Sequence, residues 1–209
     1  MRILYLLCAT ILLSGCGASS YISYQNISTP QEPYNNIFIA SVFEDINFKQ
    51  LTETTYDSCL KENINELGGV YVREAMEKTA QKIFTNSRLK LTLSHETFKV
   101  NEEIGYHEFW DAIEQSKANA ILLFNQNQFY REYKPHTITI NNSEEIYPTH
   151  NALFFIYLID AKTRQTVWAS RIDASGSSFN TKESFYKSIC KKINKALLEE
   201  KFLVPPLKQ

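Results

Sequence analysis

Continuous apolar runs along the chain predict strands that are covered on both faces. The clearest runs lie at residues 36–43, 119–124 and 152–159, and the last of these is placed centrally by its lack of polar side chains. The turn-forming segment 160–165 predicts a hairpin between 152–159 and the strand that follows it. The run at 119–124 extends into the mixed stretch 126–133, and shorter strand signals lie at 89–93, 137–140 and 166–172.

Apolar positions at helical spacing predict three main helices. Two of them cover residues 70–85 and 106–117. The third begins at Asn180, which forms an N-cap pair with Glu183: their side chains satisfy free backbone amides. It ends before Pro205.

The order of these elements, β-α-β-α-β-β-β-α, predicts the fold class. We expect a three-layer α/β (α+β) fold, in which helices pack on a mixed β-sheet of about five to six strands. The stretch 44–68 has no clean apolar period. Residues 36–207 are predicted to form a single α/β domain.

The first residues have the pattern of a bacterial lipoprotein signal. Arg2 precedes an apolar run that ends at Leu13 and is too short to span a bilayer, which takes roughly 20 residues. Small residues then precede Cys16, whose thiol would receive the diacylglycerol. We therefore expect a signal peptide over 1–15 and lipid attachment at Cys16. An ordinary cleaved signal with an incidental cysteine is the alternative.

Residues 16–35 are small, polar and interrupted by proline, which predicts a lipidated flexible tether. Gly17, and not an aspartate, follows Cys16, which agrees with sorting to the outer membrane where the enterobacterial rule applies. The expected location is the outer membrane, with the domain lipid-anchored and facing the periplasm. The membrane is thus one expected partner, through the N-terminal lipid.

Composition and charge narrow the other partners. The chain is 44% hydrophobic and 22% charged, so it can build a core, and its net charge of −1 gives no basic excess for nucleic acid.

Cys59 and Cys190 remain in the mature domain, where an oxidising compartment would preserve a disulfide between them. A free buried thiol at Cys190, on the apolar side of the last helix, is the alternative.

The chain lacks the local motifs of several catalytic classes. No G-x-S-x-G, G-x-G-x-x-G, P-loop or C-x-x-C sequence occurs. None of the four histidines has a partner at metal-ligand spacing, although His136 and His150 could approach each other across a hairpin. We therefore expect no enzymatic activity, no cofactor and no metal site.

An aromatic run outside the predicted core is the best candidate contact surface. It contains Tyr130, Arg131 and Tyr133, and Tyr147 could join it. Aromatic residues and arginine together are typical of protein–protein hot spots. If the run is a strand, alternate members face opposite ways, so at most half of them form one patch. Packing against the sheet is the competing interpretation.

A resemblance emerges from the predicted hairpin. The strand-turn-strand 158–168 resembles a hairpin in small Gram-negative envelope lipoproteins of uncharacterised families, with Arg164 in place of their usual glycine. Segment 118–123 is similar to their Ala-Asp-Ala-Ile-Leu strand, with Asn119 in place of the aspartate, and the end of the closing helix at 197–203 is similar too. Such domains are related in fold to the periplasmic domains of the penicillin-binding-protein activator and curli-secretion lipoproteins, and to the amino-terminal domain of TolB-like proteins.

The resemblance implies a three-layer α/β domain that acts by binding and has no catalytic residues. We expect a non-catalytic adaptor or accessory subunit of an envelope assembly, whose partner is another envelope protein. The alternative is a lipoprotein that binds a small ligand or a cell-wall fragment in a cleft beside residues 44–68.

Overall fold

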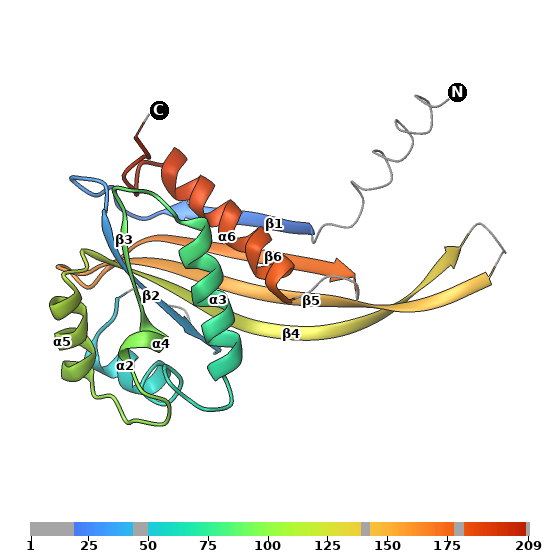
Figure 1. Cartoon of the computed structure of the whole chain (residues 1–209), viewed down its shortest axis with the longest axis horizontal. Coiled ribbons are helices and arrows are strands. Elements are labelled where there is room, and N and C mark those ends of the chain that lie inside the picture. The colour runs from blue at the N-terminus through green and yellow to red at the C-terminus, as the bar shows by residue number, and fades with distance from the viewer. Residues whose placement is uncertain (1–18, 44–49, 139–142, 178–181, 208–209) are drawn as a thin grey trace.

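The structure is a computed structural model and describes residues 19–43, 50–138, 143–177 and 182–207. In this part of the chain, six strands form one mixed sheet in the order β1-β6-β5-β4-β2-β3. Five helices pack on it, and four of them have seven or more residues (Figure 1). The predicted α/β class, a mixed sheet with helices packed on it, is confirmed.

The strands are β1 (Ser19–Asn26), β2 (Asn36–Val42), β3 (Lys90–Leu93), β4 (Ala120–Ile138), β5 (Ser143–Asp160) and β6 (Thr166–Ser177). The helices are α2 (Glu53–Cys59), α3 (Val70–Ile83), α4 (Ser94–Thr97), α5 (Tyr106–Ser116) and α6 (Lys182–Glu199). β2 runs parallel to both β3 and β4, whereas the pairs β4–β5, β5–β6 and β6–β1 are antiparallel.

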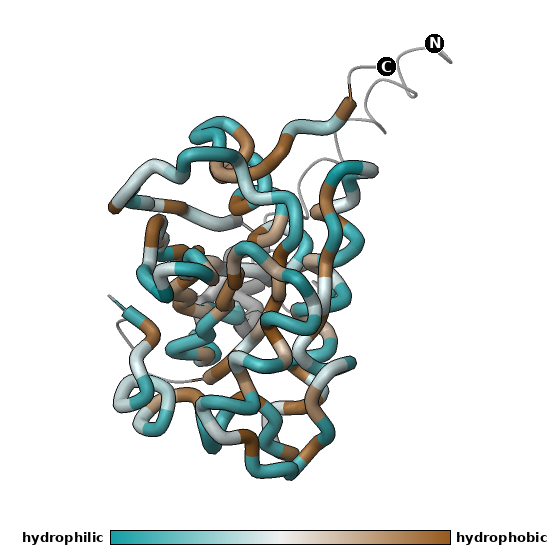
Figure 2. Tube along the Cα trace, turned by 90° about the vertical axis from the view of Figure 1, so that its left-hand side faces the viewer, coloured by the Kyte–Doolittle hydropathy of each residue, from teal (hydrophilic) through white to brown (hydrophobic). Residues whose placement is uncertain are grey.

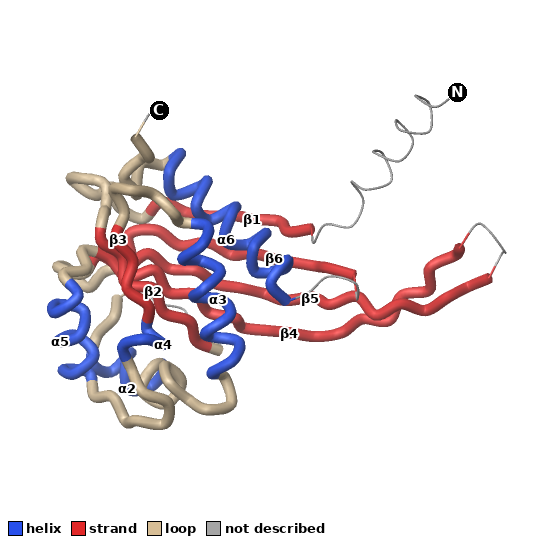
Figure 3. Tube along the Cα trace, viewed as in Figure 1, coloured by secondary structure: helices blue, strands red, loops and turns tan. Residues whose placement is uncertain are grey.

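Helices α3 and α6 cover one face of the sheet, which we call the α3–α6 face (Figure 3). Their apolar positions pack on every second residue of the central strands, because side chains alternate between the two faces of a strand. The predicted helical spacing therefore identified the buried sides of both helices. The largest fully buried side chains of the cluster on this face are those of Phe84, Phe124, Phe154, Trp168 and Phe202.

The opposite face, the α2–α5 face, carries a second cluster built largely from aromatic rings. Tyr56 of α2 packs against Phe109 of α5, with ring centroids 5.1 Å apart, and both lie over β2. Helix α2 falls in the stretch without apolar period, where Thr52 caps it by accepting from the amide of Thr55 at 3.2 Å. Because both faces of the sheet carry a helical layer, hydrophobic and hydrophilic positions alternate at short intervals along much of the chain (Figure 2).

The three predicted helices are present, with small differences at their ends. α3 ends at Ile83 and α5 at Ser116, close to the predicted limits. The predicted N-cap residue of α6, Asn180, lies outside the described residues.

The predicted tether over 16–35 is wrong for residues 19–26, which form the edge strand β1 against β6. Ile22 is partly buried against the core of the α3–α6 face. The ring of Tyr24 stacks on Trp168 with centroids 5.8 Å apart, and its hydroxyl donates to Glu200 at 3.0 Å. These contacts offset the entropy of ordering a polar segment.

Strands β4 and β5 form a hairpin much longer than predicted. The expected short strand 137–140 begins as the end of β4, which continues through Pro135 to Ile138. The backbone of His136 lies opposite Glu145, whereas His150 lies opposite Arg131. The two histidines therefore occupy positions five residues apart along the hairpin, so their backbones do not lie opposite each other.

The turn between β5 and β6 confirms the predicted hairpin and explains the arginine in it. Asp160 accepts from the backbone amide and the hydroxyl of Thr163, at 2.7 and 2.9 Å. Arg164 adopts the left-handed conformation with φ of 60°, which costs a non-glycine residue about 1–2 kcal/mol. Its guanidinium donates to the hydroxyl of Tyr106 at 2.8 Å and lies 4.5 Å from the Trp110 ring, so the side chain joins the turn to α5.

The predicted disulfide between Cys59 and Cys190 is not formed, and both thiols are free. Cys190 is fully buried in the cluster on the α3–α6 face, whereas Cys59 packs against the cluster on the α2–α5 face. The sheet lies between them, and a disulfide needs Cα atoms within about 7 Å. Burial raises the pKa of the Cys190 thiol, which keeps it protonated and unreactive.

We predict that the two thiols differ strongly in reactivity. Iodoacetamide added to the native protein should alkylate the partly exposed Cys59 and leave Cys190 unmodified, because only a thiolate within reach of the reagent is attacked. Peptide mass spectrometry checks this, and alkylation of both thiols after unfolding is the control. A Cys59–Cys190 linked peptide in unreduced protein would contradict it.

Candidate functional site

The structure separates the members of the predicted contact patch. Tyr130 lies opposite Asn151 and faces the α2–α5 side of the sheet. Arg131 and Tyr133 lie opposite His150 and Pro148 and face the other side. The backbone of Tyr147 lies opposite Lys134 in the same hairpin, and its side chain lies outside the described side chains. The four residues therefore do not form one patch.

Helices cover only part of the α2–α5 face. They pack over β2, the adjoining part of β4 and the inner part of β5, whereas no described helix covers β1, the outer part of β6 and the outer half of β5 (Figure 1). We call this area the open face. It contains a hollow of about 470 Å³. The side chains that define it are those of Tyr21, Tyr130, Leu153, Arg171 and Asp173.

Register explains why these side chains gather. Tyr21 lies opposite Asp173, and Asp173 lies opposite Leu153, so the three form one row across three strands. Tyr130 borders the next row along the sheet. Tyr21 is 70% exposed and Tyr130 is 53% exposed. Two large rings thus stand at the sides of a shallow surface that is partly polar and partly apolar.

An ion pair occupies the middle of the open face. The guanidinium of Arg171 donates to both carboxylate oxygens of Asp173, with Nε–Oδ2 at 3.1 Å and Nη2–Oδ1 at 3.2 Å. Both side chains are about half exposed. An exposed pair of this kind contributes only about 0–1 kcal/mol to folding. Its guanidinium and carboxylate are therefore available to a partner. Aromatic rings beside arginine are the composition of protein-binding hot spots.

Sequence reasoning found Tyr130 but missed the rest of the open face. Tyr21 was assigned to the tether, and Arg171 and Asp173 were read only as part of a strand region. The alternation of Ile22 and Tyr24 with polar residues was the signal that identifies β1. It is weak because an edge strand buries few side chains.

A second hollow, of about 570 Å³, lies beside α2 and the loop after it. Its lining includes one basic side chain, Lys61, which pairs with Glu103 at 2.9 Å. The acidic side chains in the lining are Asp57, Glu62, Glu66, Glu102 and Glu103. This excess of negative charge repels anionic ligands.

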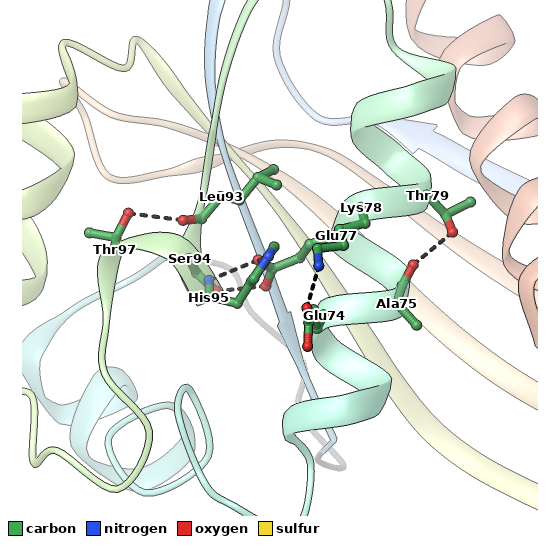
Figure 4. A network of polar contacts seen from close by, with 9 residues as sticks. All are labelled: Glu74, Ala75, Glu77, Lys78, Thr79, Leu93, Ser94, His95 and Thr97. Carbon is green, nitrogen blue, oxygen red and sulfur yellow. Dashed lines mark hydrogen bonds and ion pairs between the residues drawn. The ribbon is translucent and has the colours of Figure 1, made fainter.

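A buried polar network joins α3 to α4 (Figure 4). The fully buried carboxylate of Glu77 accepts from the hydroxyl of Ser94 at 2.6 Å and from the backbone amide of His95 at 3.0 Å. The Nδ1 atom of His95 lies 2.8 Å from the same carboxylate. Ser94 donates its single hydroxyl proton to the carboxylate, so the imidazole does not activate it as a nucleophile. The network has a structural role.

Arg73 lies one helical turn before Glu77 and is 1% exposed. Its three guanidinium nitrogens have no hydrogen-bond partner among the described residues. Burial lowers the pKa of this guanidinium, and the nearby carboxylate of Glu77 opposes that shift. The two charges thus stabilise each other inside the α3–α6 layer.

Within the described ranges, no group of three or more histidine, cysteine, aspartate or glutamate side chains is placed to hold a metal ion. No described helix combines the length and apolar character that a membrane crossing requires. Cys16 and the predicted signal peptide lie outside the described residues.

No protein-family model matches the chain, and no curated protein matches it in sequence. Solved structures with a similar fold include the PelC dodecamer from Paraburkholderia phytofirmans, with a TM-score of 0.47 and 11% identity over 90% of this chain and 100% of that one. Lipoprotein GNA1162 from Neisseria meningitidis has a TM-score of 0.44 and 10% identity, over 79% and 99% of the two chains. A minor lipoprotein from Acinetobacter baumannii has a TM-score of 0.33 and 9% identity, over 78% and 92%.

These similarities concern the fold alone. The resemblance to small envelope lipoproteins, and to the penicillin-binding-protein activator, curli-secretion and TolB-like domains, stays a prediction.

We predict that the buried network stabilises the domain far more than the exposed ion pair next to it. Glu77→Gln should lower the free energy of unfolding by about 1–3 kcal/mol, because one buried donor loses its acceptor. Glu74→Gln, which removes an exposed pair with Lys78 on the same helix, should cost under about 0.5 kcal/mol. Urea unfolding measures both variants, and equal losses would contradict the prediction.

Proposed function

We propose that this protein is a lipid-anchored, non-catalytic lipoprotein on the periplasmic side of the outer membrane. It acts as an adaptor or accessory subunit of an envelope assembly, and it binds a protein partner through the open face. The observation that carries the proposal is the row of aromatic and charged side chains on a part of the sheet that no described helix covers.

The chemistry of the open face favours a protein partner. Tyr21 and Tyr130 offer large contact area at low entropic cost, since each side chain has two rotatable angles. The paired Arg171 and Asp173 offer donors and acceptors in a fixed geometry. The hollow between them is shallow and has a mixed polar and apolar lining, unlike the deep apolar pockets that enclose small ligands.

One observation supports a non-catalytic role, and a second bears on the choice between a protein and a small ligand. Ser94 and His95, the serine and histidine with a shared acidic partner, are held in a structural network. The acidic hollow beside α2 lies where the alternative function, binding of a small ligand or cell-wall fragment, requires a cleft. Its charge admits neutral or cationic ligands only. Protein binding is therefore the better-supported function.

Lipidation at Cys16 is the first testable part of the proposal. Cells fed radiolabelled palmitate should incorporate label into the wild-type protein, and Cys16→Ser should abolish the incorporation because the acceptor thiol is lost. Cys8→Ser is the matched control, since Cys8 lies within the expected signal peptide and leaves with it. Label retained in the Cys16→Ser protein would refute lipidation at this residue.

Partner binding is the second part. A photo-crosslinking amino acid at Tyr130 should give one adduct of defined mass in envelope preparations, and the same group at Tyr71 should give none. Tyr71 is a matched control, because it is 81% exposed but lies on α3, away from the open face. Adding Tyr21→Ala should reduce the adduct by about tenfold or more, as expected for a hot-spot side chain. An equal amount of adduct from Tyr130 and from Tyr71 would overturn the proposed surface.

A further inference from the structure

The start of β1 and the end of the β4–β5 hairpin lie at the same end of the sheet (Figure 1). Ser19 is opposite Ser175, Ser175 is opposite Asn151, and Asn151 is opposite Tyr130. These four residues form one row across the sheet. Beyond it, β4 and β5 continue outward, while β1 begins there.

We call the outer part of the hairpin the arm, and define it as residues 133–138 of β4 with 143–148 of β5. In the described part of the chain, these segments pair only with each other, because β6 ends opposite Thr149 and β2 ends opposite Asn125. From Tyr130 to Ile138, β4 advances eight residues, which is about 26 Å at the rise of a strand. The arm thus projects well past the row that contains Ser19.

The following step rests on the proposed lipid anchor at Cys16. Cys16 precedes Ser19 by three residues, and three residues span at most about 11 Å. The lipid therefore holds Ser19 within about 11 Å of the bilayer surface. Since the arm reaches farther than that from the same row, it meets the membrane when the hairpin is inclined toward the bilayer.

The backbone of the arm limits how deep it can lie. A two-stranded ribbon has unpaired amide and carbonyl groups along both outer edges, and each such group costs several kcal/mol in hydrocarbon. The sequence of the arm also includes Lys134, Glu144 and Glu145. The arm is therefore suited to the hydrated headgroup layer and not to the interior of the bilayer.

Side chains at the base of the arm fit that layer. Phe129 and Tyr133 are on the α3–α6 side of β4, where they are 44% and 65% exposed, and Arg131 is exposed between them. Aromatic side chains concentrate at membrane–water interfaces, and arginine reaches from there to phosphate. Tyr133 follows Tyr130 by three residues, the same number that separates Cys16 from Ser19. Tyr133 thus lies about as far beyond the row of Ser19 and Tyr130 as the lipidated Cys16 can lie.

We propose that the arm lies in the headgroup layer of the membrane that holds the anchor, with Phe129 and Tyr133 as interfacial contacts. The domain then touches the membrane at two points, the lipid and the arm. Tyr130 and the open face point to the other side of the sheet, so membrane contact and partner binding use different faces of the same hairpin.

An indole at the base of the arm tests the proposal. The full lipidated chain carrying Tyr133→Trp is reconstituted into phosphatidylethanolamine–phosphatidylglycerol vesicles, with or without brominated acyl chains, which quench nearby indoles. The native Trp110 and Trp168 are 4% and 0% exposed and give a constant background. The added emission should fall about twofold or more in brominated vesicles, as for an aromatic ring at the interface. Tyr71→Trp is the control and should show no quenching.

The outcomes separate the two proposals. Protein that floats with the vesicles while neither indole is quenched would refute the arm contact and leave the lipid anchor intact. Protein that does not float with the vesicles would refute the anchor, and the arm contact with it. Equal quenching of both indoles would show that the domain lies on the membrane by another face.

Discussion

The antiparallel ladder between β4 and β5 is the interaction on which the rest of the structure depends. It extends from Ala120 opposite Asp160 to Ile138 opposite Ser143. Its inner half contributes apolar side chains to both helical layers, and its outermost third forms the arm. Because side chains alternate along a strand, a slip of one residue would turn each of them to the opposite face. Both helical layers would then meet the wrong side chains.

A bulge between Gln126 and Gln128 adds one residue to β4, so the side chains beyond it alternate between the two faces in the opposite order. Before the bulge, Leu122 and Phe124 face α3 and α6; after it, Tyr130 faces the opposite side. Without the extra residue, Tyr130 would point to the side that now holds Phe129 and Tyr133. The bulge thus determines which aromatic rings border the open face. Pro135 is tolerated farther out, because no described strand pairs with the outer edge of β4 there.

The parts of the fold that could be predicted are those whose burial leaves a mark in the local sequence. The apolar cores of β2, β4 and β5 and the amphipathic helices α3, α5 and α6 were identified because both faces, or one helical face, are buried. β1 was missed since Ile22 is the only aliphatic side chain in its interior that packs on the core. The continuation of β4 through Pro135 was missed because proline usually ends a strand.

Features that depend on which face of the sheet a residue occupies could not be read from the sequence. The pairing of Cys59 with Cys190 was compatible with composition, and only the three-dimensional arrangement puts the sheet between them. The open face likewise joins Tyr21, Tyr130 and Arg171 from three strands that are distant in sequence. Local patterns contain no information on such neighbours until the strand order is known.

The inclusion of β1 in the sheet has a mechanical consequence. A flexible leader would absorb tension between the membrane and the domain by uncoiling. Here Ser19 is the point of entry into a strand, and its pairing with β6 runs antiparallel from Ser175 to Trp168. Tension along the strand axis loads the inter-strand hydrogen bonds together, in shear, and does not open them one after another. A pull on the N-terminus is therefore carried directly into the central sheet.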